Sequence, residues 1–234
     1  MGQVRPELLP GRSARICAAL RHAILEQALL PGTKLPEDLV GEQFGVSRTV
    51  VRDAFIRLHT EGLIDLQPHR GAAVAVPGIE EAREVFEARR CLEAATVRTL
   101  ASRIDADDIA RLETHVDDEV AARDGDPPRS IRLAGEFHVV LAELAGNQVL
   151  ARFVSQVVSR CSLILAVHRR PHSPDCAVEE HRGIIDALRR CDGDAAAALM
   201  ERHIGAVEER AAVEPPREVD VSEVLMRYTA GNRR

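Results

Sequence analysis

Residues 35–71 read LPEDLVGEQFGVSRTVVRDAFIRLHTEGLIDLQPHRG, and this stretch decides the fold of the N-terminal part of the chain. It predicts two short helices joined by a tight turn, followed by two short strands. Gly45 in the turn can take the positive φ that ends the first helix. Ser47 can cap the second helix, because its hydroxyl can accept a backbone N–H of the first turn. The pattern is typical of a helix-turn-helix unit.

The second helix of this unit carries the candidate DNA-binding residues. Arg48, Thr49 and Arg52 fall on its outer face, and the two arginines are one helical turn apart. Such a helix suits the major groove of DNA, where Arg can pair bidentately with guanine. An exposed helix of a hairpin that binds nothing can also carry arginines, so the pattern alone leaves both interpretations open.

The residues that follow predict a small β-hairpin. Residues 63–66 (LIDL) and 73–76 (AVAV) have the character of strands, and the residues between them have the composition of a turn. A helical unit followed by such a hairpin is a winged helix. His69, Arg70 and Gly71 at the tip of the wing would then lie at the DNA backbone or minor groove.

Composition indicates a mainly helical protein with an uneven charge distribution. The net charge is −6, yet residues 1–76 hold nine Lys/Arg and eight Asp/Glu, against 22 and 29 in residues 77–234. The acidity therefore belongs to the second part, and the first can still bind DNA through local placement of charge. No apolar run approaches the length of a transmembrane span, so none is expected. The five scattered cysteines are typical of reduced cytoplasmic thiols.

We expect four segments. They are a winged helix-turn-helix domain (1–76), a linker (77–79), an all-helical antiparallel bundle (80–212) and a charged C-terminal tail (213–234). Gly, Pro and Asn mark the ends of the helices in the bundle. The expected helices lie near residues 79–101, 105–123, 129–146, 148–169, 174–191 and 194–212.

The N-terminal part resembles the winged helix of the GntR family of bacterial transcription regulators. The motifs that carry the resemblance are Pro31-Gly32, Gly45 to Arg48, Val51-Arg52 with Ala54, Leu58 with Glu61-Gly62-Leu63, and Arg70-Gly71 with Val74. The resemblance implies that Arg48 and Arg52 contact operator DNA, assisted by Ser47, Thr49 and the wing. One departure is Asp38, where some members carry an arginine.

Three histidines are candidates for a metal site. His138, His181 and His203 each lie on the apolar stripe of a different expected helix, the face that turns toward the interior. A single inward histidine is usually a hydrogen-bonded core residue. Three of them in one small domain can instead converge as ligands of Zn²⁺ or Ni²⁺. The spacing leaves both alternatives open.

Residues 80–212 resemble the FCD ligand-binding domain of the FadR-like GntR subfamily, above all in EFHVVLAELAGNQVL and EEHRGIIDALRRCDGDAAAALMERHI. By this resemblance His138, His181 and His203 occupy the three histidine positions of the metal site. An Asp that precedes the first histidine by one turn in many such domains is replaced by Ala134 here. Water, an effector carboxylate or a ligand from elsewhere would complete the coordination.

Arg89 matches a position where the family often has an arginine near the ligand cavity. It could pair with an effector carboxylate, or form a salt bridge with Glu87 or Glu93.

The sequence predicts a ligand-responsive, sequence-specific transcription regulator, a repressor and homodimer rather than an enzyme. Two winged helices would read the half-sites of a near-palindromic double-stranded operator. The helical domain would bind a small carboxylate effector, through a divalent transition metal such as Zn or Ni. Two rivals are a metal-dependent hydrolase fused to a winged helix, and a regulator whose histidines are structural and bind no metal.

Overall fold

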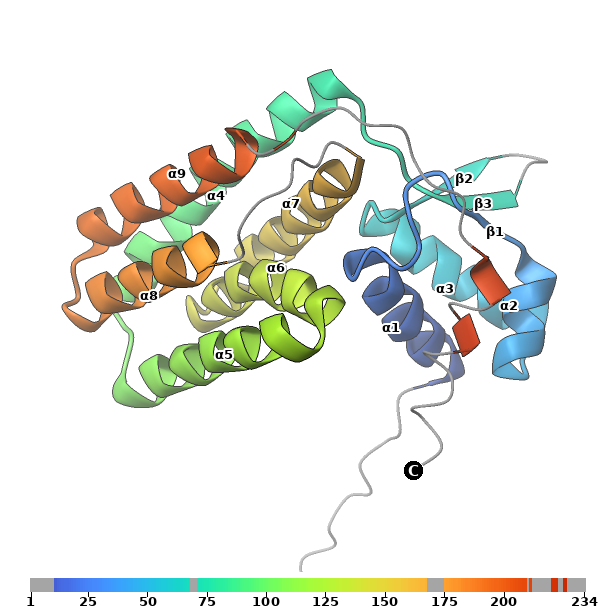
Figure 1. Cartoon of the computed structure of the whole chain (residues 1–234), viewed down its shortest axis with the longest axis horizontal. Helices are drawn as coiled ribbons and strands as arrows, with labels where there is room; N and C mark the ends of the chain where they lie inside the picture. The colour runs from blue at the N-terminus through green and yellow to red at the C-terminus, as the bar shows by residue number, and fades with distance from the viewer. Residues whose placement is uncertain are drawn as a thin grey trace, which may run out of the picture.

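The computed structural model describes residues 11–67, 71–167, 175–209, 211, 220–222 and 225–226. These residues form a winged part and a helical bundle that lie beside each other (Figure 1). The winged part contains α1 (Arg12–Leu25), β1 (Lys34–Leu35), α2 (Glu37–Phe44), α3 (Arg48–Thr60), β2 (Ile64–Gln67) and β3 (Gly71–Val74). The bundle contains α4 (Ile79–Ala101), α5 (Ala106–Gly125), α6 (Pro127–Leu144), α7 (Gln148–Val167), α8 (Asp175–Arg189) and α9 (Gly193–Glu209). The predicted mainly helical architecture is confirmed.

Apolar residues at helical spacing hold the winged part together. Ile16 and Leu20 of α1 belong to the same buried cluster as Val51, Phe55 and Leu58 of α3. Because these residues recur every three or four positions, they form one stripe on each helix. Packing of the two stripes leaves the opposite face of α3 exposed.

The turn between α2 and α3 has the predicted glycine conformation. Gly45 has φ +63° and ends α2 in the left-handed region. Ser47 stands at the N-cap of α3, but its side chain makes no capping hydrogen bond, so the predicted role of its hydroxyl is wrong. The start of α3 is therefore set by the turn and by packing.

The wing is part of a three-stranded antiparallel sheet with strand order β1-β3-β2. Ile64 pairs with Val74 and Gln67 with Gly71, so the hairpin has the predicted connectivity. β1 pairs with the other edge of β3 and was not predicted, because two residues are too few to show an alternating pattern. His69 and Arg70 lie outside the described residues.

The helices of the bundle begin and end close to the expected positions. The clearest difference is at α6, which begins at Pro127 rather than near residue 129. Proline fits the first turn of a helix because the N–H groups there have no partner within the helix. The Asp126 carboxylate accepts a hydrogen bond from the Arg129 N–H at 3.3 Å. Pro127 and Pro128 therefore start the helix instead of separating it from the previous one.

Within the described residues, α7 is a helix that is long and apolar enough to cross a membrane by length and composition. The sequence had predicted no such segment. α7 packs against α4 and α6 of the bundle and against α1 of the winged part. This position between two packed parts is that of a core helix.

α7 also connects the two parts of the molecule. Leu163 belongs to the buried cluster of the winged part, whereas Cys161 and Ile164 belong to the cluster of the bundle. The Arg160 Nη1 donates to the Gly62 carbonyl oxygen at 2.6 Å, and the same guanidinium contacts Glu81. One helix thus contributes to both cores.

Part of the expected C-terminal tail packs on the winged part. Leu225 is fully buried in the cluster formed by α1 and α3, and Val221 packs against the same cluster. These two residues therefore add apolar contacts from the C-terminal segment to the core of the winged part.

Gly62→Ala should lower the free energy of unfolding by about 2 kcal/mol. Gly62 has φ +74°, and an added Cβ would lie 2.8 Å from the Arg160 Cδ. Urea unfolding of Gly62→Ala and Gly45→Ala separates the two causes, because Gly45 has φ +63° and open space around its Cβ position. Equal losses in the two variants would show that the Arg160 contact contributes nothing.

Candidate functional site

The predicted recognition residues lie on the exposed face of α3. The side chains of Arg48 and Arg52 are 65% and 64% exposed. Acidic residues of α2 hold both guanidinium groups: the Arg48 Nη2 lies 2.7 Å from the Asp38 Oδ2, and the Arg52 Nε lies 2.8 Å from the Glu37 Oε2. Any ligand of these two arginines must therefore displace two carboxylates, and the sequence had not indicated these pairs.

The other predicted DNA-binding residues are placed unevenly. Ser47 and Thr49 are exposed at the start of α3, beside Arg48. Gly71 begins β3 with φ +82°, a conformation that suits glycine. The structure thus brings the helix residues onto one surface. Of the three predicted wing residues, it describes Gly71, which pairs with Gln67.

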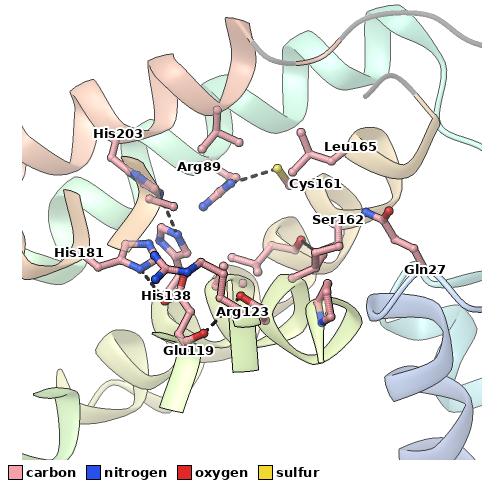
Figure 2. A pocket seen from close by; sticks show the side chains of 18 residues that line it. Gln27, Arg89, Glu119, Arg123, His138, Cys161, Ser162, Leu165, His181 and His203 are labelled. Carbon is pink, nitrogen blue, oxygen red and sulfur yellow. Dashed lines mark hydrogen bonds and ion pairs between the residues drawn. The ribbon is translucent and has the colours of Figure 1, made fainter. Parts of the chain in front are cut away.

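The bundle contains a partly open cavity of about 230 Å³ (Figure 2). Its wall is mixed, with the three candidate histidines, the polar side chains of Arg89, Ser130 and Ser162, and several aliphatic side chains. Ala134, at the position of the missing aspartate, also lines the cavity and offers no ligand atom. The cavity combines apolar walls with a few convergent polar groups, as small-molecule sites do.

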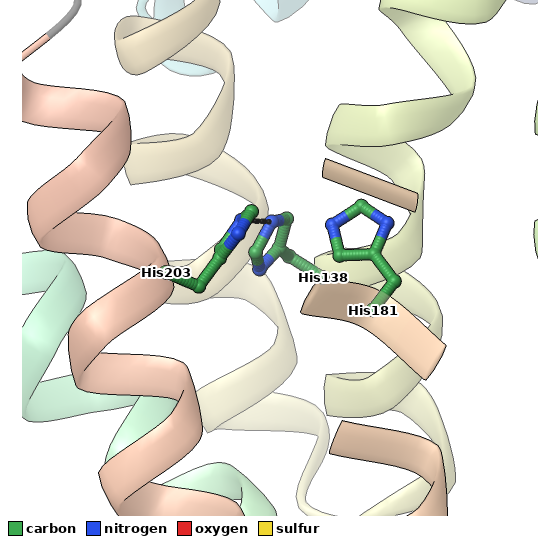
Figure 3. Close-up of side chains that lie close together, drawn as sticks. All are labelled: His138, His181 and His203. Atoms are coloured by element: carbon green, nitrogen blue, oxygen red, sulfur yellow. Dashed lines mark hydrogen bonds between the residues drawn. The ribbon is translucent and has the colours of Figure 1, made fainter. Parts of the chain in front are cut away.

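His138 of α6, His181 of α8 and His203 of α9 meet at one end of this cavity (Figure 3). All three are buried, and one nitrogen from each lies within 4.8 Å of the others. The Nε2 atoms of His138 and His203 are 3.2 Å apart, and the His181 Nε2 has no hydrogen-bond partner. Three convergent imidazoles are a set of ligands that suits Zn²⁺ and similar cations.

A glutamate lies behind each of the three imidazoles. The Nδ1 atoms of His138, His181 and His203 lie 2.5, 3.0 and 2.7 Å from carboxylate oxygens. The partners are Glu93 of α4, Glu119 of α5 and Glu180 of α8, respectively. For His181 and His203 the contact is a hydrogen bond, which fixes the ring and directs the other nitrogen forward, as is usual for histidines that bind metal; for His138 it is a close contact with the carboxylate. Sequence reasoning missed these roles, although Glu93 was considered as a partner of Arg89.

Phe137 further fixes the orientation of His181. The two rings are stacked, with centroids 4.1 Å apart and planes 22° from parallel. Such packing restricts rotation of the imidazole and favours one direction for its Nε2 atom.

Arg89 is almost fully buried, and of the two predicted alternatives the structure contains the salt bridge with Glu93. Its Nε donates to the Glu93 Oε1 at 2.6 Å, and its Nη1 donates to the Cys161 sulfur at 3.0 Å. The pair with Glu93 lies within α4 and is not interhelical. The Nη2 has no partner, so one donor of a buried cation remains for a ligand in the cavity.

Burial and neighbouring charges shift the protonation equilibria of this network. Burial lowers the pKa of His138 to about 4, although the Glu93 carboxylate opposes this shift. Burial raises the pKa of Glu93, but Arg89 and then His138 outweigh it and hold that pKa at about 2. His138 is therefore neutral near pH 7, which is the form that can bind a metal.

This fold and cavity define the class of protein: a DNA-binding regulator with a separate domain that can hold a small molecule. Residues 12–74 match the family "Bacterial regulatory proteins, gntR family", and residues 84–206 match "FCD domain".

Related proteins and structures agree. The "HTH-type transcriptional repressor RspR" of Escherichia coli (strain K12) is 30% identical over 83% of this chain and 86% of that protein. The "Galactonate operon transcriptional repressor" of the same strain is 28% identical over 79% and 90%. A GntR regulator structure from Rhodococcus sp. RHA1 is 27% identical, with a TM-score of 0.72 over 85% of this chain and 96% of that one. E. coli McbR/YncC, at 21% identity, a TM-score of 0.72 and coverage of 86% and 99%, shares the fold.

The chain belongs to the GntR family of transcription regulators and carries an FCD domain. The family resemblance noted in the sequence is thereby confirmed. Because the related proteins are regulators and not enzymes, the hydrolase alternative is not supported.

The free energy of unfolding of the metal-free protein should fall as the pH drops from 6.5 towards 4. The folded protein protonates His138 only near pH 4, whereas the unfolded chain does so near 6.5, so the unfolded state binds more protons between these values. Urea unfolding in the presence of a chelator measures the effect. His138→Gln should show a shallower pH dependence than a matched His115→Gln variant, and equal slopes would contradict the assignment.

Proposed function

We propose that this protein is a homodimeric repressor whose affinity for operator DNA depends on a small organic acid bound at a divalent transition metal. The observation that carries the proposal is the set of three buried imidazoles, each with a carboxylate at Nδ1. Burying polar groups is costly unless they have partners. A set of buried imidazoles backed by carboxylates therefore supports the presence of a bound cation.

The residues present fit a metal ion with open coordination positions. His138, His181 and His203 would hold Zn²⁺ or Ni²⁺ through the nitrogens that converge in the cavity. Ala134 supplies no fourth ligand, so oxygen atoms of water or of the effector would complete the coordination. The metal would supply a positive charge that captures an anion inside a largely apolar space.

The effector is proposed to be a hydroxy acid. Its carboxylate would meet the metal and the remaining Nη2 donor of Arg89, and its hydroxyl groups would meet polar residues of the wall such as Ser130 and Ser162. One related regulator is named for the galactonate operon, which makes D-galactonate a reasonable first probe.

Operator binding is proposed to use the exposed face of α3. Arg48 and Arg52 would leave Asp38 and Glu37 and pair with base edges, with Ser47, Thr49, His69, Arg70 and Gly71 assisting. Two copies of the chain in the cytoplasm would bind the half-sites of a near-palindromic operator. The effector would alter operator affinity by a coupling free energy of about 1–3 kcal/mol.

A second candidate is a regulator whose histidines are structural. The 3.2 Å contact between the Nε2 atoms of His138 and His203 favours it, because two imidazoles can hydrogen-bond to each other without a metal. Elemental analysis of protein purified without chelator decides between the two. Less than one transition metal per three chains would favour structural histidines.

His181→Ala should abolish stoichiometric zinc binding, because it removes the ligand whose Nε2 has no protein partner. Glu119→Gln should weaken zinc affinity by about 10–100-fold, since it alters the carboxylate that orients His181. Calorimetric titration of the full chain measures both effects. The control is His115→Ala, because His115 hydrogen-bonds to the Leu133 carbonyl outside the triad. Wild-type affinity in His181→Ala would refute the metal site.

Arg52→Ala should weaken binding to the selected operator by about 1–3 kcal/mol and relax base preference. Selection from random duplexes identifies the operator, and fluorescence anisotropy then measures affinity. The control is Arg57→Ala, which removes another exposed arginine of α3 that pairs with Asp53. Unchanged affinity after combined Arg48→Ala and Arg52→Ala would mean that α3 is not the recognition helix.

A further inference from the structure

The winged part contributes a side chain to the cavity of the bundle. Gln27, in the segment after α1, lines the cavity together with residues of α4 to α9. Among the described residues that line it, Gln27 alone comes from the winged part. Figure 2 shows Gln27 beside Ser162, on the side of the cavity opposite the three histidines. A molecule that spans the cavity would therefore touch both parts of the protein.

The backbone at Gln27 has an unusual conformation that aims its side chain. Gln27 has φ +57°, a region that non-glycine residues rarely adopt. The turn is held by main-chain hydrogen bonds, since the Gln27 N–H donates to the Ile24 carbonyl and the Leu29 N–H donates to the Ala23 carbonyl, each at 2.9 Å. Strained residues of this kind are concentrated at ligand sites and switch regions.

The residue before Gln27 fastens this turn to the wall of the cavity. The Arg132 Nε of α6 donates to the Glu26 carboxylate at 2.9 Å, and the two side chains are only 15% and 13% exposed. Arg132 also pairs with Glu136 at 2.7 Å. Its neighbours Ile131 and Ala134 line the cavity. The turn and the α6 wall are therefore held together by a largely buried ion pair.

We propose that the Gln27 side chain binds the end of the effector that is remote from the histidines. Because Gln27 lies in the turn directly after α1, a bound effector then fixes the position of that turn relative to α1. The inference rests on the proposed function and names the specificity-determining contact of that site. An amide both donates and accepts hydrogen bonds, so it matches the terminal hydroxyl of a hydroxy acid. Ser162 beside it adds a second hydroxyl partner.

The length of the effector then decides whether the DNA-binding part responds. A short acid binds at the histidines and Arg89 and ends before Gln27. A longer polyhydroxy acid reaches Gln27 and stabilises one position of the turn after α1. Since α1 packs on α3, fixing this turn also affects the placement of α3, the helix that carries Arg48 and Arg52.

Calorimetric titration of the zinc-loaded full chain with D-galactonate and with glycolate tests the proposal. Gln27→Ala should weaken D-galactonate binding by about 3–10-fold, the loss of one neutral hydrogen bond, and leave the Kd values of zinc and glycolate unchanged. The matched control is Gln156→Ala. Gln156 donates to the Thr60 carbonyl at 3.1 Å and so joins the two parts without lining the cavity. The Gln156→Ala variant should bind D-galactonate and glycolate with wild-type affinity.

Hydrogen exchange supplies a second readout in the same variants. D-galactonate should protect amides of residues 12–33 and of α6 in the wild type and in Gln156→Ala, but only those of α6 in Gln27→Ala. Gln27→Asn, which accepts a positive φ more readily and shortens the side chain, should behave like Gln27→Ala. It keeps the test valid if the alanine variant folds poorly.

The outcomes separate the inference from the proposed function. Equal D-galactonate affinity and equal protection of residues 12–33 in the wild type and both Gln27 variants would overturn the role of Gln27 alone. A wild-type chain that binds zinc but neither acid would overturn the proposed effector class, and the inference with it. A wild-type chain that binds no zinc would refute the metal site itself.

Discussion

Buried charge inside the helical bundle is the constraint on which the rest of the structure depends. Arg89 and Glu93 lie one turn apart on α4, only 3% and 1% exposed, and Glu93 faces His138 of α6. Such groups are costly in the interior unless each has a partner, so α4 and α6 must dock in one arrangement. Apolar side chains could hold the helices together equally well. The network therefore has two consequences beyond holding the helices together. It positions the His138 imidazole, and it leaves the Arg89 Nη2 for a ligand.

α7 is largely apolar because it contributes to two cores. Leu163 enters the core of the winged part, and Ile164, the next residue, enters the core of the bundle, so α7 has two buried faces. A helix that is apolar on more than one face reads in sequence like a membrane segment, but here two separate cores account for it. Because Cys161 on this helix also accepts from Arg89, a change at the cavity acts on a helix that the winged part shares.

The parts of the structure that sequence could predict are those that local rules specify. Gly45 marks the turn because few other residues accept its φ, and His138 was found because it interrupts an apolar stripe. Glu119 and Glu180 were missed because a glutamate on an amphipathic helix ordinarily faces solvent, and only docking of α5, α8 and α9 shows otherwise. Gln27 lies in a connection with no periodic pattern, so its place in the cavity depends wholly on tertiary packing.

Ala134 changes the charge balance of the proposed site. Three neutral imidazoles would leave the two positive charges of a metal uncompensated by direct ligands. Of the carboxylates behind the rings, Glu93 is already balanced by Arg89, whereas Glu119 and Glu180 would act only through the imidazoles that they contact. An aspartate at position 134 would have neutralised one charge and occupied one coordination position. With a methyl group there, an effector carboxylate would serve as both ligand and counter-ion of the proposed metal. By linkage, the proposed metal and acid would then raise each other's affinity by the same factor, so the domain would respond to their joint presence.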